Sequence, residues 1–285
     1  MTSRRRLDTE LVRRGLVASR EQAQVAIAAG EVLVRGTVAD KASRLVDPAE
    51  PVALAAPPAR FVSRGGLKLE AALDEFAIDV GGRRALDAGA STGGFTDCLL
   101  QRGAAEVVAV DVGRGQLHQR LAVDARVDSR ERTDIRNLTL AQVGGRPFDL
   151  IVADLSFISL RSVLAVLLGS LAVPGADVVT LVKPQFEAGR QAASAGRGVI
   201  RDPSIWSATL TRVISAMTAG GASMMGLMVS PLTGAEGNVE FLAYCRAHAS
   251  REGDEQAPEA APPSAEQLVA AAVGRAARRH GIEYQ

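Results

Sequence analysis

Residues 85–95 read Ala-Leu-Asp-Ala-Gly-Ala-Ser-Thr-Gly-Gly-Phe, and this stretch decides which fold the sequence predicts. A short apolar strand runs directly into a turn that contains Gly89, Gly93 and Gly94. Because glycine lacks a Cβ atom, the backbone of this turn can bend sharply and approach a ligand closely. A helix is predicted to begin near Phe95. The spacing of the glycines differs from G-x-G-x-x-G, which makes a dinucleotide pyrophosphate site a poor fit.

Outward from this stretch, apolar strands alternate with helical segments between residues 61 and 248. Six strands are predicted, in chain order Ala85–Leu86, Val107–Val110, Leu150–Ala153, Val178–Val182, Ala222–Val229 and Val239–Tyr244. Strands that alternate with helices are typical of an α/β protein with a doubly wound, parallel sheet. Only a short loop with proline and glycine separates the last two strands, so these two are predicted to pair antiparallel.

Acidic residues mark the ends of the first two predicted strands. Asp87 follows the first strand, and Asp111 follows the second. Ligands of doubly wound sheets bind outside the carboxyl ends of the strands, where a carboxylate can accept hydrogen bonds from ribose hydroxyls. A glycine-rich turn alone can be purely structural. Together with Asp87 and Asp111, it indicates a site for a nucleoside-type ligand.

Three more charged residues stand where predicted strands begin or end. Asp154 follows the third strand, Lys183 closes the fourth, and Glu240 begins the last. A charged side chain at the end of a buried strand costs free energy unless it is partnered or functional. Only three of the 33 basic residues are lysines, and lysine, unlike arginine, can lose its proton in a protein. Lys183 is therefore a candidate for chemistry, whereas Asp154 alone could equally be a helix N-cap.

The N-terminal residues 1–47 are predicted to form a small α+β unit of their own. Ser19 and Gln22 are spaced as a capping box that begins a helix, and Val32–Val38 indicates two short strands around a tight turn. Residues 1–44 contain nine basic and five acidic residues, a net charge of +4, whereas the whole chain carries only +1. Positive charge is thus concentrated at one end of the chain.

The remaining boundaries follow from proline and polar composition. Four prolines in residues 48–60 predict a linker. Residues 61–248 are predicted to form the α/β domain. Residues 249–285 are predicted to be a flexible tail with a terminal helix that begins at Ser264 and ends near Arg279.

The composition restricts the classes of protein to which the chain can belong. Hydrophobic residues make up 47% and charged residues 23% of the 285 residues, which allows a sizeable core and excludes wholesale disorder. Two cysteines cannot form a disulfide framework, which favours a reducing, cytoplasmic compartment. The histidines, His118, His248 and His280, lack the spacing of a metal site. No membrane insertion is expected, because glycines and Pro231 interrupt the longest uncharged stretch.

Five sequence elements together resemble the FtsJ-type ribose 2′-O-methyltransferases. They are Ser63-Arg64-Gly65-Gly66-Leu67-Lys68-Leu69, the turn Asp87–Phe95, Asp154-Leu155, Lys183-Pro184 and Glu240. That family carries a Lys-Asp-Lys-Glu tetrad in this order, and the resemblance implies Lys68, Asp154, Lys183 and Glu240 as catalytic residues. It also implies a Rossmann-like methyltransferase sheet, mostly parallel with an antiparallel last strand.

The N-terminal unit resembles the small RNA-binding domain named after ribosomal small-subunit protein four. The matching residues are Arg6-Leu7-Asp8, Leu11, Ser19-Arg20, Ala23, Ile27, Gly30, Val32, Val34, Gly36 and Lys41. The fusion of the two domains, together with the segment Leu181–Glu187, resembles the TlyA family over roughly residues 4–247. This resemblance implies methylation of cytidine ribose in ribosomal RNA of both subunits, with capreomycin sensitivity as a consequence, and a haemolytic association.

The resemblance further implies the cofactor S-adenosylmethionine and a division of roles. Cofactor contacts are expected from Asp87, Gly89, Ala90, Ser91, Gly93, Gly94, Phe95, Asp111 and Asp134. RNA contacts are expected from Arg4, Arg6, Arg20, Lys41, Arg64, Arg132 and Arg136. Lys183 is expected to activate the 2′-hydroxyl, by taking its proton or stabilising the alkoxide, while the other three catalytic residues orient Lys183. Residues 184–201 are hypothesised to form a loop that orders on RNA.

Two other functions stay open at this level. A haemolysin that acts on membranes would need an exposed amphipathic or spanning element, which the sequence does not predict. A non-catalytic RNA-binding or ribosome-assembly protein would not need the four ordered polar residues. A nicotinamide-dependent enzyme is the least favoured, because of the glycine spacing. The expected partners are ribosomal RNA or ribosomal subunits.

Overall fold

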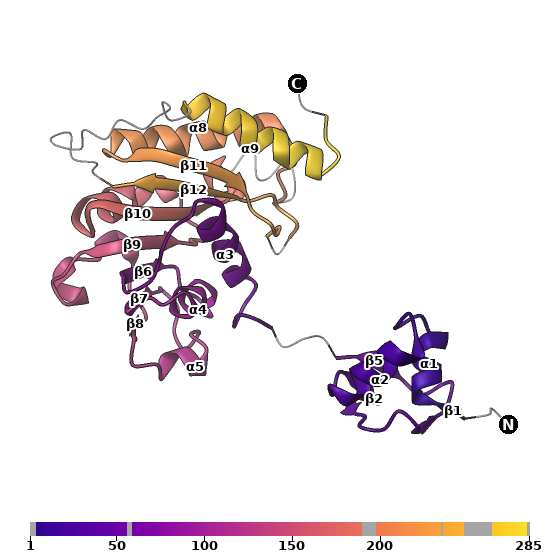
Figure 1. Ribbon diagram of the computed structural model, residues 1–285. Helices are drawn as coiled ribbons and strands as arrows, with labels where there is room; N and C mark the ends of the chain where they lie inside the picture. Colours follow the sequence, from indigo (N-terminus) through magenta and orange to yellow (C-terminus); the bar gives the residue numbers. More distant parts are fainter. Residues whose placement is uncertain (1–3, 56–58, 190–197, 235, 248–263, 284–285) are drawn as a thin grey trace. The chain divides into compact units, whose positions relative to one another are not determined.

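The computed structural model describes residues 4–55, 59–189, 198–234, 236–247 and 264–283 (Figure 1). The chain divides into two units, Met1–Arg60 and Phe61–Gln285.

The smaller unit has an α+β fold, as predicted. It contains β1 (Arg5–Arg6), α1 (Leu7–Arg13), α2 (Arg20–Ala28), β2 (Val32–Val34), β3 (Thr37–Val38), β4 (Leu45–Val46) and β5 (Val52–Leu54). β1 pairs with β4, and the other strands form an antiparallel sheet in the order β3-β2-β5. The predicted tight turn is confirmed, since Arg35 and Gly36 both have the positive φ of a two-residue hairpin turn. Ser19 caps α2 by accepting a hydrogen bond from the Gln22 backbone N–H.

The strand β5 corrects the predicted linker at residues 48–60. Val52–Leu54 pairs with β2 and therefore belongs to the smaller unit. Pro51 precedes this edge strand, a position where the missing N–H of proline costs no ladder hydrogen bond. Its carbonyl oxygen accepts a hydrogen bond from the Arg35 backbone N–H at 2.9 Å. The sequence pointed to a linker because prolines flank a strand that is only three residues long.

The larger unit is built around a seven-stranded sheet in the order β11-β12-β10-β9-β6-β7-β8. Its strands are β6 (Arg84–Ala88), β7 (Glu106–Val110), β8 (Val127–Arg130), β9 (Phe148–Ala153), β10 (Ala172–Val182), β11 (Ser223–Val229) and β12 (Phe241–Arg246). Its helices are α3 (Gly65–Glu75), α4 (Gly94–Gln101), α5 (Gln119–Ala122), α6 (Pro184–Glu187), α8 (Pro203–Ala219) and α9 (Ala265–Arg279), with short turns η1 (Ile135–Asn137), η2 (Leu140–Val143), η3 (Leu160–Ser162) and η4 (Val166–Ser170). The strands from β10 to β8 pair in parallel, and β12 pairs antiparallel with both β10 and β11. The predicted mostly parallel sheet with an antiparallel last strand is confirmed.

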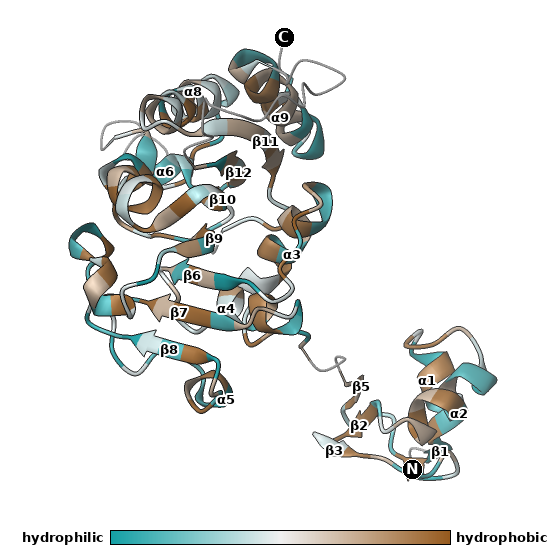
Figure 2. Ribbon diagram, turned by 60° about the vertical axis from the view of Figure 1, so that its left-hand side comes forward, coloured by the Kyte–Doolittle hydropathy of each residue, from teal (hydrophilic) through white to brown (hydrophobic). Residues whose placement is uncertain are grey.

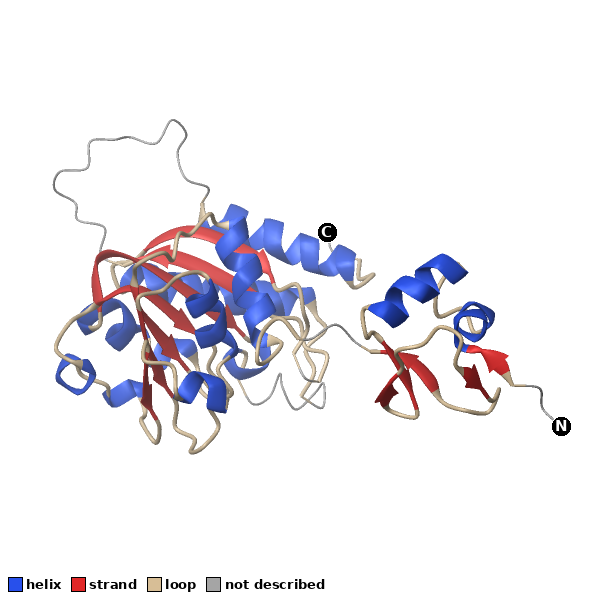
Figure 3. Ribbon diagram, turned by 60° about the horizontal axis from the view of Figure 1, so that its bottom comes forward, coloured by secondary structure: helices blue, strands red, loops and turns tan. Residues whose placement is uncertain are grey.

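Helices cover both faces of this sheet (Figure 3), and the strands alternate their side chains between two cores. In β9, Leu150 and Val152 pack with residues of α3 and α4, whereas Ile151 packs on the opposite face with residues of α8. β7 is hydrophobic along most of its length (Figure 2) because it is buried on both faces. The edge strand β8 is largely polar and lacks such a run of apolar residues, so it is absent from the strands predicted from the sequence.

The terminal helix predicted within residues 249–285 is present as α9, but it is packed on the domain rather than being part of a flexible tail. Ser264 and Gln267 form the predicted capping box, which begins the helix. Val269 and Val273 are buried, and α9 packs against α8 and β11 (Figure 1). The reason is an apolar face at helical spacing, which the polar composition of the preceding segment obscured. Residues 248–263 lie outside the described residues.

The topology brings several loops to one edge of the sheet. The parallel strands β6, β7, β9 and β10 end there, and the antiparallel β12 begins there, with Phe241 opposite Val182. Residues just after β9 and β10 and just before β12 therefore come close together. In doubly wound sheets this edge is where ligands bind.

Candidate active site

The glycine turn after β6 passes very close to its neighbours. Gly89 has φ of +87°, and a Cβ atom at this position would lie 2.5 Å from the backbone oxygen of Asp154. Gly93 has φ of +94° and caps α4 in the left-handed conformation. At Gly89 backbone packs against backbone, whereas a Cβ atom at Gly93 would collide with the side chains of Leu117 and Leu121. The close contact at Gly89 brings the end of β6 against the end of β9.

A pocket of about 660 Å³ lies at this edge of the sheet, which is a volume typical of ligand sites. Its walls come from the start of α3, the turn after β6, the segment after β9, α6 and the loop before β12. Of the expected cofactor residues, Gly89, Ala90, Ser91, Gly94 and Phe95 line it. All four members of the expected catalytic tetrad line it as well.

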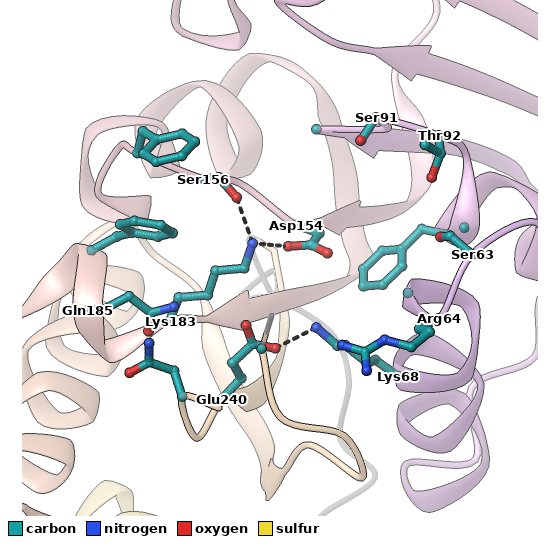
Figure 4. A pocket seen from close by; sticks show the side chains of 18 of the residues that line it. Ser63, Arg64, Lys68, Ser91, Thr92, Asp154, Ser156, Lys183, Gln185 and Glu240 are labelled. Carbon is teal, nitrogen blue, oxygen red and sulfur yellow. Dashed lines mark hydrogen bonds and ion pairs between the residues drawn. The ribbon is translucent and has the colours of Figure 1, made fainter. Parts of the chain in front are cut away.

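The tetrad forms two ion pairs in this pocket (Figure 4). Lys183 Nζ lies 2.6 Å from Asp154 Oδ1 and donates a hydrogen bond to Ser156 Oγ at 2.9 Å. Lys68 Nζ lies 2.5 Å from Glu240 Oε2. Both lysines and Glu240 are buried. Direct contact with Lys183 comes from Asp154, whereas Lys68 and Glu240 pair with each other.

The Lys68–Glu240 pair is buried and Asp154 is half-buried, so removal of one partner would leave a charge that is poorly compensated by solvent. The ammonium group of Lys183 is held from two sides, by Asp154 and by Ser156. A hydroxyl group brought to this pocket would meet a positioned amine with fixed neighbours. As an ammonium, Lys183 can stabilise a developing negative charge on oxygen, and as a neutral amine it can accept a proton.

An exposed aromatic side chain stands at the same pocket. Phe157 is 87% exposed and has φ of +68°, which is rare for a bulky residue. Its ring lies 5.2 Å from the ring of Phe186, and both residues line the pocket. Strained backbone and exposed aromatic rings are concentrated at functional sites. Sequence reasoning assigned no role to Ser156, Phe157 or Phe186, since a Leu-Ser-Phe segment carries no signal that its ring is exposed.

Glu187 links two of the segments that form the pocket, α6 and the segment after β9. Its carboxylate accepts hydrogen bonds from Ser159 Oγ at 2.6 Å and from the Leu160 backbone N–H at 2.5 Å. Glu187 ends α6, which follows Lys183 directly, whereas Ser159 belongs to the segment after Asp154. The buried carboxylate therefore fixes the segments that carry Lys183 and Asp154 relative to each other.

The expected cofactor carboxylates take three different environments. Asp87 is fully buried, and Thr96 Oγ1 donates a hydrogen bond to its Oδ2 at 2.6 Å. Its Oδ1 finds no hydrogen-bond partner among the described residues, and burial raises the pKa of this carboxyl to about 7. Asp111 accepts hydrogen bonds from the Ser91 and Gly113 backbone N–H groups at 2.8 and 2.7 Å, beside the pocket.

The last expected cofactor residue, Asp134, caps η1 and forms an ion pair with Arg136 at 2.5 Å. The hydrogen bond from Arg136 lowers the pKa of the Asp134 carboxyl. Because Arg136 was expected to contact RNA, the structure couples an expected cofactor residue to an expected RNA residue. Sequence reasoning did not foresee this pair.

Two expected RNA residues share one buried carboxylate. Arg6 and Arg20 each place Nη2 2.9 Å from Asp8 Oδ2. The bond from Arg6, with a second one from Arg20, holds the pKa of the Asp8 carboxyl far below its usual range. The two guanidinium groups are therefore held side by side.

The other expected RNA residues are placed separately. Arg4, Lys41 and Arg132 are exposed. Arg64 lines the pocket and donates a hydrogen bond from Nη2 to the Thr233 carbonyl oxygen at 3.5 Å.

Two known proteins are similar to this chain over most of its length. The protein named 16S/23S rRNA (cytidine-2′-O)-methyltransferase TlyA of Mycobacterium tuberculosis is 49% identical over 252 residues, which cover 88% of this chain and 93% of the relative. Hemolysin A of Brachyspira hyodysenteriae is 40% identical over 241 residues, which cover 84% of this chain and 98% of the relative.

A solved structure from Streptococcus thermophilus, named as a candidate hemolysin, has a TM-score of 0.69 and 38% identity. The similarity covers 99% of this chain and 100% of that one. No helix within the described part of the chain is both long enough and apolar enough to span a membrane.

The family models agree with the motifs found in the sequence. Residues 5–52 match the S4 domain, which covers β1 to the start of β5. Residues 61–247 match the FtsJ-like methyltransferase, which includes the glycine turn and all four tetrad residues. The family predicted from the sequence is thereby confirmed, and the chain belongs to the FtsJ-like methyltransferases, with an S4 domain at its N-terminus.

Proposed function

We propose that this chain transfers a methyl group from S-adenosylmethionine to the ribose 2′-hydroxyl of a cytidine in ribosomal RNA. The observation that carries the proposal is the pair of ion pairs, Lys183–Asp154 and Lys68–Glu240, in one pocket beside a glycine turn. The name of the Mycobacterium tuberculosis relative, a 16S/23S rRNA (cytidine-2′-O)-methyltransferase, supports the substrate. The compartment would be the cytoplasm, where ribosomal RNA is found.

The residues around the glycine turn suit a nucleoside cofactor with a positive charge. Gly89 and Gly94 expose backbone to the pocket, and Ser91 is anchored to Asp111. Asp87 lies buried at the end of β6, with one oxygen unpartnered among the described residues. A carboxylate also keeps free lone pairs after two hydrogen bonds, so Asp111 could still accept from ribose hydroxyls. S-adenosylmethionine held here would supply a methyl group on a positively charged sulfur.

Lys183 would act on the nucleophile. As a neutral amine, its Nζ would take the proton of the 2′-hydroxyl; as an ammonium, it would stabilise the developing alkoxide. The new oxygen–carbon bond would form as the bond between the methyl carbon and the donor sulfur breaks, with the bonding electron pair left on that sulfur. Asp154 and Ser156 hold that nitrogen in place. Lys68 and Glu240 form the opposite pair in the pocket and would limit the positions open to the ribose. Much of the rate would come from alignment of the reacting groups.

The target nucleotide would be held by stacking. Every base has a flat π-face that can stack on an aromatic ring. Phe157 offers an exposed ring at the pocket, supported by Phe186. A nucleotide that enters a pocket leaves the stack of its neighbours in the RNA, as in enzymes that act on a base. Phe157 would then compensate the nucleotide for lost stacking.

The S4 domain would supply most of the affinity for RNA. Arg6 and Arg20, held together by Asp8, suit contacts with phosphate groups. Contacts of this kind make affinity fall steeply with salt. The hypothesised loop over residues 184–201 stays part of the proposal only in part, since residues 190–197 lie outside the described residues.

The test is methyl transfer to ribosomal RNA and to isolated ribosomal subunits, with labelled S-adenosylmethionine and mapping of the modified ribose. Lys183→Met removes the amine and keeps most of the side-chain length. We expect it to abolish transfer while calorimetry shows cofactor binding largely intact. Full activity of Lys183→Met, or label on a base rather than on ribose, would contradict the proposal.

A further inference from the structure

The terminal helix α9 lies beyond residues 61–247, which carry the methyltransferase family match, yet its last residue contacts the segment that leads to Glu240. Val269, Val273 and Ala276 are buried on one face, which docks the helix against α8 and β11. At its end, Arg279 donates hydrogen bonds to two backbone carbonyl groups. Nη1 bonds to Ser230 O at 3.0 Å, and Nη2 bonds to Pro231 O.

The segment that receives these bonds, residues 230–234, leads from β11 toward Glu240. The Ser230 backbone N–H donates to the Glu240 carbonyl oxygen at 2.8 Å. Gly234 lies directly against the Glu240 side chain, since a Cβ atom at 234 would stand 2.6 Å from Oε1. Glu240 therefore fits beneath residues 230–234, and its other oxygen contacts Lys68 (Figure 4).

A second cavity, of about 260 Å³, lies beside the same residues. It is lined by Arg279 and His280 from the end of α9, by residues 229–233 and by Glu240. Open space next to residues 230–233 leaves them room to move if the bonds from Arg279 are lost. If this segment were closely packed on all sides, packing alone would hold it in place without the guanidinium group of Arg279.

We propose that Arg279 is a positioning residue for methyl transfer, which fixes residues 230–234 and thereby holds Glu240 against Lys68. This inference rests on the proposed function. It assigns to the terminal helix a part in the geometry of the pocket in addition to its part in the core. Arg279 does not touch the pocket itself and would act only through residues 230–234.

The experiment compares Arg279→Ala with Arg278→Ala. The control removes the same charge from the same helix turn and leaves Arg279 in place. We expect kcat of Arg279→Ala to fall roughly tenfold to a hundredfold, as small misplacements of reacting groups do, with cofactor affinity unchanged. Arg279→Lys keeps the charge but loses the planar fork that reaches both carbonyl groups, so its kcat should lie between those of Arg279→Ala and Arg278→Ala. Because the apolar face of α9 is untouched, both Arg279 variants should melt near the wild-type temperature.

Chemical rescue separates positioning from stability. The cavity beside Arg279 has room for guanidinium ion, so millimolar guanidinium should restore part of the kcat of Arg279→Ala. Urea, which is similar in shape but uncharged, should not. Equal kcat for Arg279→Ala and Arg278→Ala would overturn the inference, as would a loss of activity explained by melting alone. Wild-type protein without methyl transfer would instead contradict the proposed function.

Discussion

The buried carboxyl group of Asp87 leads us to predict how the free energy of unfolding changes with pH. It is fully buried, and burial, the largest cause, raises its pKa from the ordinary 3.8 to about 7. Between about pH 4 and pH 7, the folded protein therefore holds one more proton at this position than the unfolded chain. Stability must then fall as the pH rises through that window and level off above it. One pKa unit corresponds to about 1.4 kcal/mol, so the cost above pH 7 is roughly 4 kcal/mol.

Asp87→Asn removes this cost, because an amide does not ionise and its oxygen can still accept the hydrogen bond from Thr96. We expect the variant to be more stable than wild type at pH 8, by up to roughly 4 kcal/mol, and equally stable near pH 4. Urea unfolding from pH 4 to pH 9 measures both curves. The exposed Asp79→Asn is the matched control and should follow wild type. Parallel curves for wild type and Asp87→Asn would refute the reasoning.

Two further predictions concern RNA. Phe157→Ala should lower kcat/KM for RNA by roughly tenfold or more, since stacking of one base contributes about 1–3 kcal/mol. Phe157→Tyr should retain activity, and calorimetry should show unchanged cofactor binding in both variants. An unchanged kcat/KM of Phe157→Ala in steady-state kinetics would exclude stacking. Arg20→Ala should weaken RNA binding and make the slope of log affinity against log salt shallower by about 0.7–0.9, the value of one phosphate contact. The kcat at saturating RNA should not change. A salt titration measures the slope, and an unaltered slope would show that Arg20 does not contact RNA.

The fold could be predicted because its strands are marked by burial. β7, β9 after Asp149 and residues 178–182 of β10 are buried on both faces, so these segments are almost wholly apolar and easy to recognise. β8 and β5 were not predicted, because they are edge strands and need no continuous run of apolar residues. α9 was recognised as a helix from its cap. Its docking was missed because a 16-residue polar and proline-rich stretch, residues 248–263, precedes it.

Some residues of the candidate site could likewise be predicted from the apolar strands that they adjoin. Asp154, Lys183 and Glu240 could be found because each stands at the end of an apolar strand, where a charge is conspicuous in sequence. The topology then brings strand ends to one edge, so isolated motifs become one pocket. The role of Lys68 came only from the family resemblance, because a lysine within a helix is not conspicuous.

The supporting residues depend on distances that sequence does not encode. Arg279 lies 48 residues beyond Pro231, and nothing in either segment alone indicates their bond. Phe157 is exposed and has a positive φ although it is not a glycine, and its sequence neighbours indicate neither property. A catalytic group must be of a particular residue type, so it leaves a trace in sequence. A residue that positions it needs only to reach it, and several side chains could do so from several places. The groups that act are therefore easier to predict from sequence than the groups that hold them in place.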